Sequence, residues 1–349
     1  MHIAEGIITG KAAVLYTAVG LTSVGYGTRK MKQFVASHPD KRPLLAMGGA
    51  LIFFISLLPI PAFTGTCSHP CGTPLIAIFF GPGICIALTG ASLLLQAAFF
   101  AHGGFGSWGA NVLALGVVGG VVGWGIFSLL RKTGLPLWAA GFAAGLLGDL
   151  MVYLCSGLVL AGALVHAPTP QYSFTGYLAV ILAAYCPTQL PIAFGEMVIT
   201  GLALQYIYRQ RPEVLADLGL LKQVPRECAK TVCLTLLLIV PAAFLLLLPA
   251  NASLAAAGQP IGASSQKTAP KEHVSQPKSS FTGMDEAVNT QMAEKAGYHS
   301  KPFLDLESMG DVWNGLLLLA GAICGFILGR WWHLISRRGN FEEKQTNGC

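Results

Sequence analysis

The sequence predicts an all-α integral membrane protein with about nine membrane segments. Composition is the first reason: 53% of the 349 residues are hydrophobic and only 11% are charged, against about 25% charged residues in a typical soluble domain. The second is a series of apolar runs long enough to cross a hydrocarbon core of about 30 Å as helices. The third is the placement of Lys and Arg, which cluster between these runs.

The apolar runs define the predicted segments. They cover residues 12–28, 43–60, 74–101, 109–130, 134–163, 175–207, 231–249 and 312–335. The third run is too long for one pass of about 20 residues, and Gly81-Pro82-Gly83 interrupts it. We therefore predict two passes there, a short one to about residue 82 and a full one to about residue 101.

The basic residues support this count, because Lys and Arg concentrate in short cytoplasmic loops. With two passes in the third run, the clusters at residues 29–42, 131–132, 209–230 and 330–344 all face one side. A single pass would place the 131–132 pair opposite the first cluster.

The predicted location is the cell (inner) membrane, with the N-terminus outside and the C-terminus in the cytoplasm.

A change of composition predicts two modules. Residues 1–210 are hydrophobic with short loops and form the predicted seven-helix bundle, and residues 211–230 form a basic cytoplasmic connector. Residues 231–349 form a two-span module. Its parts are a span at 231–249, an outer hydrophilic loop at 250–311, a span at 312–335 and a cytoplasmic tail.

The first two residues have the spacing of a metal chelate. The α-amine of Met1, the amide nitrogen of His2 and the His2 Nδ1 atom close a five-membered and a six-membered ring around a divalent transition metal. No cleavable signal precedes the first run, so we expect Met1 to keep its amine. One further nitrogen would complete a planar set, and a histidine from elsewhere in the chain is the obvious donor.

The predicted topology puts two more histidines on the outer face with His2. His69 lies in the loop at residues 61–73, and His102 lies in the turn at residues 101–108. Imidazole is a common ligand for first-row metals, so several histidines at one mouth indicate a metal site. His38 and His333 fall on the inner side and are interpreted as interfacial.

Five motifs, in this order, resemble a known family. They are MHIAEG, TGTCSHPCGTPLIAIFFGP, AHGGFGSWGANVLALGVVG, GLLGDLMVY and CPTQLPIAFGE. They are similar to the CbiM/NikM substrate-capture subunits of energy-coupling factor transporters for cobalt and nickel, over about residues 1–210. The tail from about residue 228 resembles the small two-span partner CbiN, through GMDEAV and the Gly-rich final span.

The resemblance implies a site and partners. In that family the terminal amine, the amide and imidazole of the second residue and a loop histidine hold the ion, and they correspond here to Met1, His2 and His69. Transport needs a transmembrane coupling subunit and ATPase subunits. The chain itself contains no phosphate-binding G-x-x-x-x-G-K-[ST] loop. The resemblance therefore implies a transport subunit with no catalytic residues, no resident cofactor and no nucleic-acid partner.

Two arguments bear on the transported ion. Four planar nitrogens suit Ni(II) or Cu(II) by geometry, whereas Cys-Ser-His-Pro around His69 and the CbiN-like tail resemble the cobalt members. We favour Co(II), with Ni(II) as the alternative. Cys71 departs from the family pattern. With Cys67 it could form a disulfide, supply a soft ligand or remain one of two buried thiols.

Several residues could support the ligands. His102, Asn111, Ser68 and Cys67 lie beside the predicted ligands and could orient them by hydrogen bonds. For Asn111 a role in joining helices is equally open.

Other polar and small residues suggest structural roles. Asp149 and Glu196 are polar residues in or near spans and are interpreted as structural. Glu5 could attract the cation or cap the first helix. Glycines at 116, 119, 120 and 123 suit close helix packing, inside the bundle or against the coupling subunit.

Two other protein classes would also gather histidines at a membrane surface. A metalloenzyme is one, but the chain lacks an H-E-x-x-H motif, and no acidic general base is adjacent in sequence to His69 or His102. A metal sensor or channel without ATP-driven partners is the other. Dependence of metal uptake on ATPase subunits discriminates these classes from an importer.

Overall fold

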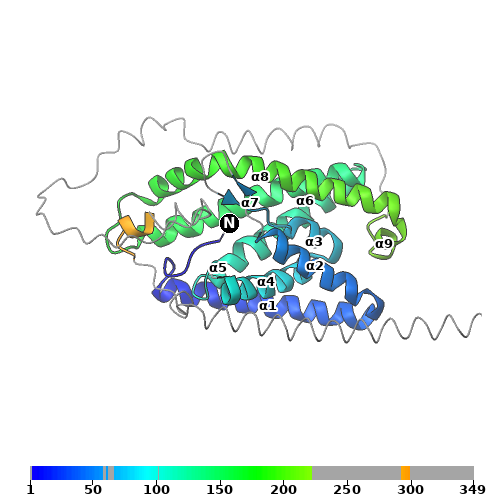
Figure 1. The fold of residues 1–349 in the computed structure, drawn as a ribbon, viewed down its shortest axis with the longest axis horizontal. Coiled ribbons are helices and arrows are strands. Elements are labelled where there is room, and N and C mark those ends of the chain that lie inside the picture. The colour runs from blue at the N-terminus through cyan, green and yellow to red at the C-terminus, as the bar shows by residue number, and fades with distance from the viewer. Residues whose placement is uncertain (1, 58–59, 62–66, 101, 222–291, 299–349) are drawn as a thin grey trace, which may run out of the picture. The chain divides into compact units, whose positions relative to one another are not determined.

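The computed structural model describes residues 2–57, 60–61, 67–100, 102–221 and 292–298, and these residues are mainly helical (Figure 1). The helices are α1 (Gly10–Ser37), η1 (Pro39–Lys41), α2 (Arg42–Ile55), α3 (Thr73–Phe80), α4 (Pro82–Phe100), α5 (Trp108–Asn111), η2 (Val112–Gly119), α6 (Gly120–Lys132), α7 (Leu137–Val165), α8 (Phe174–Gln210) and α9 (Pro212–Asp217). A two-stranded antiparallel ribbon pairs β1 (Ile60–Pro61) with β2 (Cys67–Ser68).

Helices occupy each predicted run up to residue 210, but they differ in length. In the described part of the chain, four are long and apolar enough to cross a membrane: α4, the continuous helix from Trp108 to Lys132, α7 and α8. α3 has 8 residues, which rise about 12 Å, less than a bilayer core. The predicted spans at 231–249 and 312–335 lie outside the described residues. Nine membrane segments therefore remain a prediction.

The break between α3 and α4 falls where the sequence predicts it. Gly81 has a φ of +83°, a left-handed conformation that a residue with a side chain rarely adopts, and Pro82 then opens α4. α3 leaves the loop that carries His69, and α4 returns to the turn whose His102 lies beside His69. The two helices thus run in opposite directions, as two passes through residues 74–101 require.

The end of the bundle away from His69 and His102 carries most of the described Lys and Arg residues. A cavity of about 460 Å³ there is lined by the C-terminal ends of α1, α3 and α6, including His38, Gly81 and Arg131. Lys41 and Asp217 form an ion pair of 3.2 Å between η1 and α9. The loop and turn that carry His69 and His102 therefore lie at the other ends of these helices, in agreement with the predicted separation of the histidines from the basic clusters.

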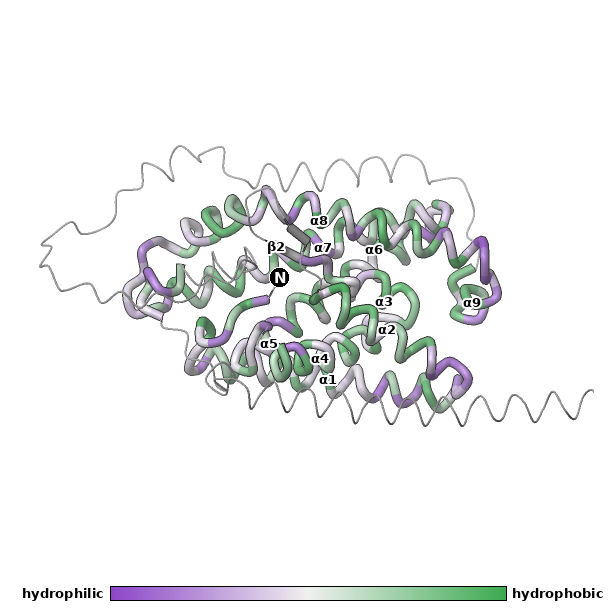
Figure 2. Tube along the Cα trace, viewed as in Figure 1, coloured by the Kyte–Doolittle hydropathy of each residue, from purple (hydrophilic) through white to green (hydrophobic). Residues whose placement is uncertain are grey.

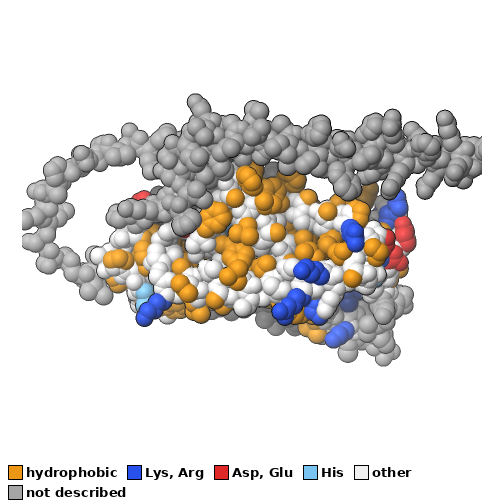
Figure 3. Space-filling model, turned by 90° about the horizontal axis from the view of Figure 1, so that it is seen from below, with side chains coloured by type: hydrophobic (Ala, Val, Ile, Leu, Met, Phe, Trp, Pro, Cys, Tyr) orange, Lys and Arg blue, Asp and Glu red, His pale blue; other side chains and the backbone are white. Residues whose placement is uncertain are grey.

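Large apolar side chains cover the outside of the helices. Met47, Phe54 and Tyr206 are 66%, 62% and 67% exposed. Figure 2 shows hydrophobic residues along most of the helical length, and in Figure 3 hydrophobic side chains occupy the middle of the visible face while most Lys and Arg lie toward one end. Soluble monomers rarely expose so much contiguous apolar surface, so this surface suits contact with lipid.

Glycines bring the helices into close contact. A Cβ on Gly119 would lie 2.7 Å from Val152 Cγ2, and one on Gly123 would lie 2.8 Å from Pro74 Cβ. These two glycines therefore pack inside the bundle, against α7 and α3. In α1, a Cβ on Gly27 would clash with the backbone of Gly83 and Ala87 in α4.

Gly27→Ala tests this packing. We expect it to destabilise the folded protein by about 1–3 kcal/mol, because α1 and α4 must separate to admit the methyl group. Gly25→Ala is the matched control on the same helix, since nothing lies within 4 Å of its added Cβ. Thermal unfolding of the two purified variants in detergent measures the difference. Equal melting temperatures would contradict the close α1–α4 contact.

Candidate metal site

Three histidine side chains converge at one place. One ligand nitrogen from each of His2, His69 and His102 lies within 4.8 Å of the others. His2 Nδ1 is 3.1 Å from His69 Nε2, and His102 Nε2 is 3.2 Å from His69 Nε2. Two nitrogens that bind one metal at about 2.0 Å and at a right angle lie about 2.8 Å apart. The spacing therefore suits a shared ion after small movements.

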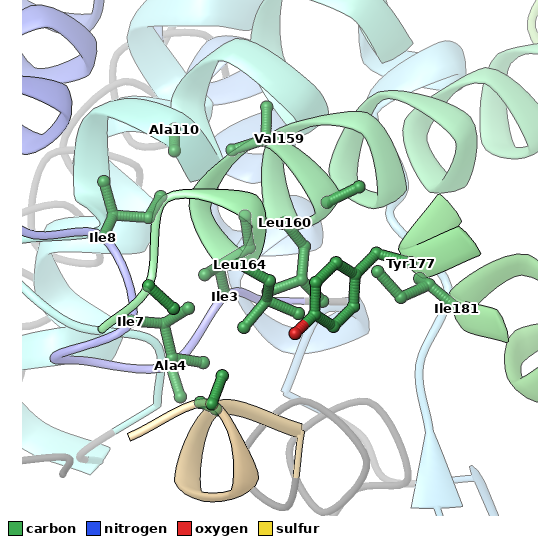
Figure 4. Close-up of a cluster of buried hydrophobic side chains, with 14 of the residues drawn as sticks. Ile3, Ala4, Ile7, Ile8, Ala110, Val159, Leu160, Leu164, Tyr177 and Ile181 are labelled. Atoms are coloured by element: carbon green, nitrogen blue, oxygen red, sulfur yellow. The ribbon is translucent and has the colours of Figure 1, made fainter. Parts of the chain in front are cut away.

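Apolar burial holds the segment that carries His2. Ile3, Ala4, Ile7 and Ile8 are buried in one cluster with residues of α7 and α8. Figure 4 shows Ile3 and Ile7 near Leu164 and the Tyr177 ring. An extended segment without such contacts would be mobile. These side chains therefore fix the position of His2.

Hydrogen bonds fix the backbone next to His2. The Ile3 N–H donates to Asn111 Oδ1 at 2.8 Å, and Asn111 Nδ2 donates back to the Ile3 carbonyl at 3.2 Å. Ser107 Oγ also donates to that carbonyl, at 2.7 Å. Asn111 had two predicted roles, orienting an imidazole or joining helices. Its hydrogen bonds place it against the backbone beside His2, so it positions His2 through Ile3.

Glu5 connects this segment to the turn that carries His102. Its carboxylate oxygens accept hydrogen bonds from the Gly106 N–H at 3.1 and 3.0 Å. Burial raises the pKa of the Glu5 carboxyl. The alternative that Glu5 caps the first helix is wrong, because α1 begins at Gly10 and its N-cap residue is Thr9.

Glu196 holds the loop that carries His69. From within α8, its carboxylate accepts hydrogen bonds from the backbone N–H of Cys71 at 3.1 Å and of Gly72 at 3.1 and 3.2 Å. Gly72 is the N-cap of α3 and has a φ of +68°. The predicted structural role of Glu196 thus has a concrete form: it fixes the loop two residues beyond His69.

Gln96 is a site residue that the sequence analysis missed. It is fully buried in α4, and its side chain lies close enough to His2 to affect the pKa of that imidazole. Its Nε2 atom also donates to Ser56 Oγ at 2.6 Å. The sequence does contain a sign of this role. A glutamine in an otherwise apolar run is costly in a membrane unless its side chain has a partner.

Burial affects the protonation of the candidate ligands. It lowers the pKa of His2 and of His69 well below the ordinary value of 6.5. Both rings are therefore neutral at neutral pH. A neutral imidazole is the form that binds a metal ion.

Several predicted site residues are not placed by the structure. Met1 and the side chains of Cys67 and Ser68 lie outside the described residues, so the Met1 amine, the disulfide between Cys67 and Cys71 and the contacts of Ser68 remain predictions. Cys71 is buried. Asp149 is buried near it.

The fold and the site together define a class, a helical multi-pass membrane protein with a histidine cluster where its loops meet. Residues 2–214 match the CbiM family, described as the cobalt uptake substrate-specific transmembrane region. The chain belongs to this family. The predicted resemblance to CbiM is therefore confirmed for the first module, while the CbiN-like nature of the tail remains a prediction.

Relatives and solved structures agree with this assignment. The chain is 34% identical to the cobalt transport protein CbiM of Geobacter sulfurreducens over 350 residues, which cover 98% of this chain and 92% of that protein. It is 37% identical over 227 residues to a putative cobalt transport protein CbiM of Methanocaldococcus jannaschii, covering 65% of this chain and 94% of that protein.

Two crystal structures of a transition metal transporter have a similar fold. One has a TM-score of 0.53 at 24% identity and covers 64% of this chain and all of that chain. A truncated form has a TM-score of 0.50 at 28% identity and covers 60% of this chain and 99% of that chain. The curated relatives are named as transport proteins, which fits a transporter rather than an enzyme.

Glu196→Gln tests the support of the His69 loop. We expect cobalt affinity to fall about 10- to 100-fold, as when a group that orients a ligand is lost, because a glutamine amide cannot accept both backbone N–H groups equally well. Glu213→Gln in α9 is the matched control, since this side chain is 59% exposed and far along the chain from the loop. Titration calorimetry with Co(II) measures both. Unchanged affinity in Glu196→Gln would show that the loop does not depend on this carboxylate.

Proposed function

We propose that this chain is the substrate-binding subunit of an ATP-driven energy-coupling factor importer for Co(II). The observation that carries the proposal is the approach of His2 Nδ1 to His69 Nε2, at 3.1 Å, between two segments 67 residues apart. Family membership supports a transport role. The protein would capture its ion at the outer face of the cell (inner) membrane.

The proposed donors are the Met1 amine, the His2 amide nitrogen, His2 Nδ1 and His69 Nε2. Only the Nδ1 atom of His2 can close the six-membered chelate ring, and Nδ1 is the atom that faces His69. In such a plane the fourth donor lies next to Nδ1 and opposite the amide. The fixed Ile3 backbone supports the proposal, because it keeps the His2 peptide in place when the ion binds.

Energy for release would come from partner subunits. The chain has no phosphate-binding loop, so ATPase subunits and a transmembrane coupling subunit would drive transport. The basic end of the bundle, where Arg131 and the Lys41–Asp217 ion pair lie, would face the cytoplasm.

The C-terminal module, residues 231–349, would assist loading as a CbiN-like part. The similarity to the Geobacter protein extends over 98% of this chain, so it includes this region. Within the predicted outer loop, Ala293 and Ala296 pack in the same cluster as Ile3 and Ala4. A segment of the loop thus contacts the residues that hold His2, which is where a loading module would act.

Cobalt is favoured over nickel on two grounds. The relatives named above are cobalt transport proteins, and the Cys-Ser-His-Pro sequence resembles the cobalt members. A nickel importer of the same type is the second candidate, because four planar nitrogens suit Ni(II).

Two changes test the ligand set. His69→Ala, and insertion of one alanine between Met1 and His2, should each abolish Co(II) binding, because each removes a donor or breaks the chelate rings. His166→Ala is the control, since this histidine is exposed at the end of α7. Metal content after gel filtration and the melting temperature are measured together. Cobalt bound at wild-type stoichiometry by either variant would refute the assignment.

Uptake in cells tests the transport class. With the ATPase and coupling subunits co-expressed, we expect accumulation of radioactive cobalt that stops when the phosphate-binding lysine of the ATPases is replaced. A sensor would cause no accumulation, and a channel would not respond to the ATPase change. Accumulation that is independent of ATP hydrolysis would exclude the importer.

A further inference from the structure

We propose that His102 is itself a ligand of the transported ion, bound on the axis of the nitrogen plane, and that this axial imidazole makes the site prefer Co(II) to Ni(II). The inference rests on the proposed function and goes beyond it. The sequence predicted His102 among the histidines at the same mouth and suggested that it orients the ligands. The structure places its Nε2 atom 3.2 Å from His69 Nε2, at ligand spacing.

The ring positions fit three imidazoles around one ion. A ring centroid lies about 1.1 Å beyond its bound nitrogen, so two rings bound at a right angle at about 2.0 Å from the metal have centroids about 4.4 Å apart. The centroids of His2 and His102 are 4.3 Å apart, those of His2 and His69 are 4.8 Å apart, and those of His69 and His102 are 5.2 Å apart. The His102 ring is tilted by 66° to His2 and 64° to His69. The His2 and His69 rings are tilted by 44° to each other, so no two of the three rings are parallel, as expected when they bind one ion from different directions.

Two ring nitrogens lie at hydrogen-bond distance from the same nitrogen of His69. His69 Nε2 lies within 3.2 Å of ring nitrogens from both His2 and His102. A ring nitrogen offers either one N–H or one lone pair in the ring plane, so it can make one good hydrogen bond in that plane. A cation between the rings would accept a lone pair from each of the three nitrogens. The convergence therefore favours an ion with three imidazole ligands.

The fold holds His102 independently of Met1. The His102 N–H donates to the Gln96 carbonyl at 3.3 Å, which closes the end of α4. Gly103 has a φ of +79°, and a Cβ there would lie 3.3 Å from Asn111 Nδ2, so the turn needs glycine at this position. Glu5 holds the far side of the turn through Gly106. His102 is partly exposed, whereas His2 and His69 are buried. It thus lies on the side from which an ion would enter.

An axial imidazole distinguishes the two ions. Planar low-spin Ni(II) has a filled d orbital along the axis, and this orbital repels a fifth donor. Co(II) has one electron fewer, and in a planar field the axial orbital is only half occupied, so it binds a fifth nitrogen. Geometry rather than intrinsic affinity is the usual basis of metal selectivity in proteins. His102 would therefore stabilise bound cobalt and leave nickel little changed.

X-ray absorption at the cobalt K-edge tests the axial bond. The full-length protein is loaded anaerobically with Co(II) alone. A planar ion without axial ligands shows a sharp 1s→4pz shoulder on the edge, so we expect the shoulder to be absent in the wild type and present in His102→Ala. The same spectrum in both proteins would overturn the proposal. His166→Ala is the control for loss of a histidine.

A thiol at the same position gives a second test. If residue 102 touches the ion, His102→Cys should show a thiolate-to-cobalt charge-transfer band in the near ultraviolet. A residue that only orients His69 would show no such band. Absence of the band in folded, cobalt-loaded protein would overturn the proposal.

Competition between ions tests the selectivity. With equimolar Co(II) and Ni(II), the ratio of bound cobalt to bound nickel should fall about tenfold in His102→Ala. An unchanged ratio would refute the selectivity role. Failure of the proposed function would give a different result, because His69→Ala would then bind cobalt fully. If only this inference fails, His69→Ala does not bind cobalt and His102→Ala binds both ions like the wild type.

Discussion

The fixed position of residues 2–8 is the constraint on which the site depends. Ordering the backbone of these seven residues costs about 1–2 kcal/mol of free energy for each residue. Burying the side chains of Ile3, Ile7 and Ile8 stabilises the ordered segment by about 1.5–3 kcal/mol for each side chain. The burial of these side chains therefore offsets only part of the ordering cost. The hydrogen bonds of Ile3 with Asn111 and Ser107 and of Glu5 with Gly106 are therefore needed to hold the segment. A histidine in an unanchored segment would lose much of its affinity to this ordering cost.

The three imidazoles depend on buried polar groups in different helices. Asn111 in α5 positions His2, Glu196 in α8 positions the His69 loop, and Gln96 in α4 contacts His2. Each group would be costly in lipid without its partner. The same hydrogen bonds that place the ligands therefore also fix how α4, α5 and α8 lie in the bundle, so the geometry of the site and the packing of the helices cannot change independently.

Sequence reasoning predicted the features that depend on local composition. Apolar runs predicted the helices up to residue 210, and Gly81-Pro82 predicted the break between α3 and α4. The end of α2 at Ile55, short of the predicted residue 60, did not follow, because composition does not specify the tertiary contacts that end a helix. Of the site, His2 followed from chelate spacing and His69 from family resemblance. The roles of Glu5 and Gln96 depend on contacts between distant segments, which one sequence does not specify.

Exposure orders the three imidazoles along a path. His102 is partly exposed, while His2 and His69 are buried, and His69 Nε2 lies within 3.2 Å of both other nitrogens. With the proposed ligands, an incoming ion would bind His102 before it has lost all its water, and would then gain His69 and His2 as it moves inward. Each step replaces a water oxygen with a ring nitrogen, so the ion does not lose a water molecule without gaining a protein ligand. Because Glu5 joins the His102 turn to the segment of His2, the first and the last of these proposed ligands are held relative to one another before the ion arrives.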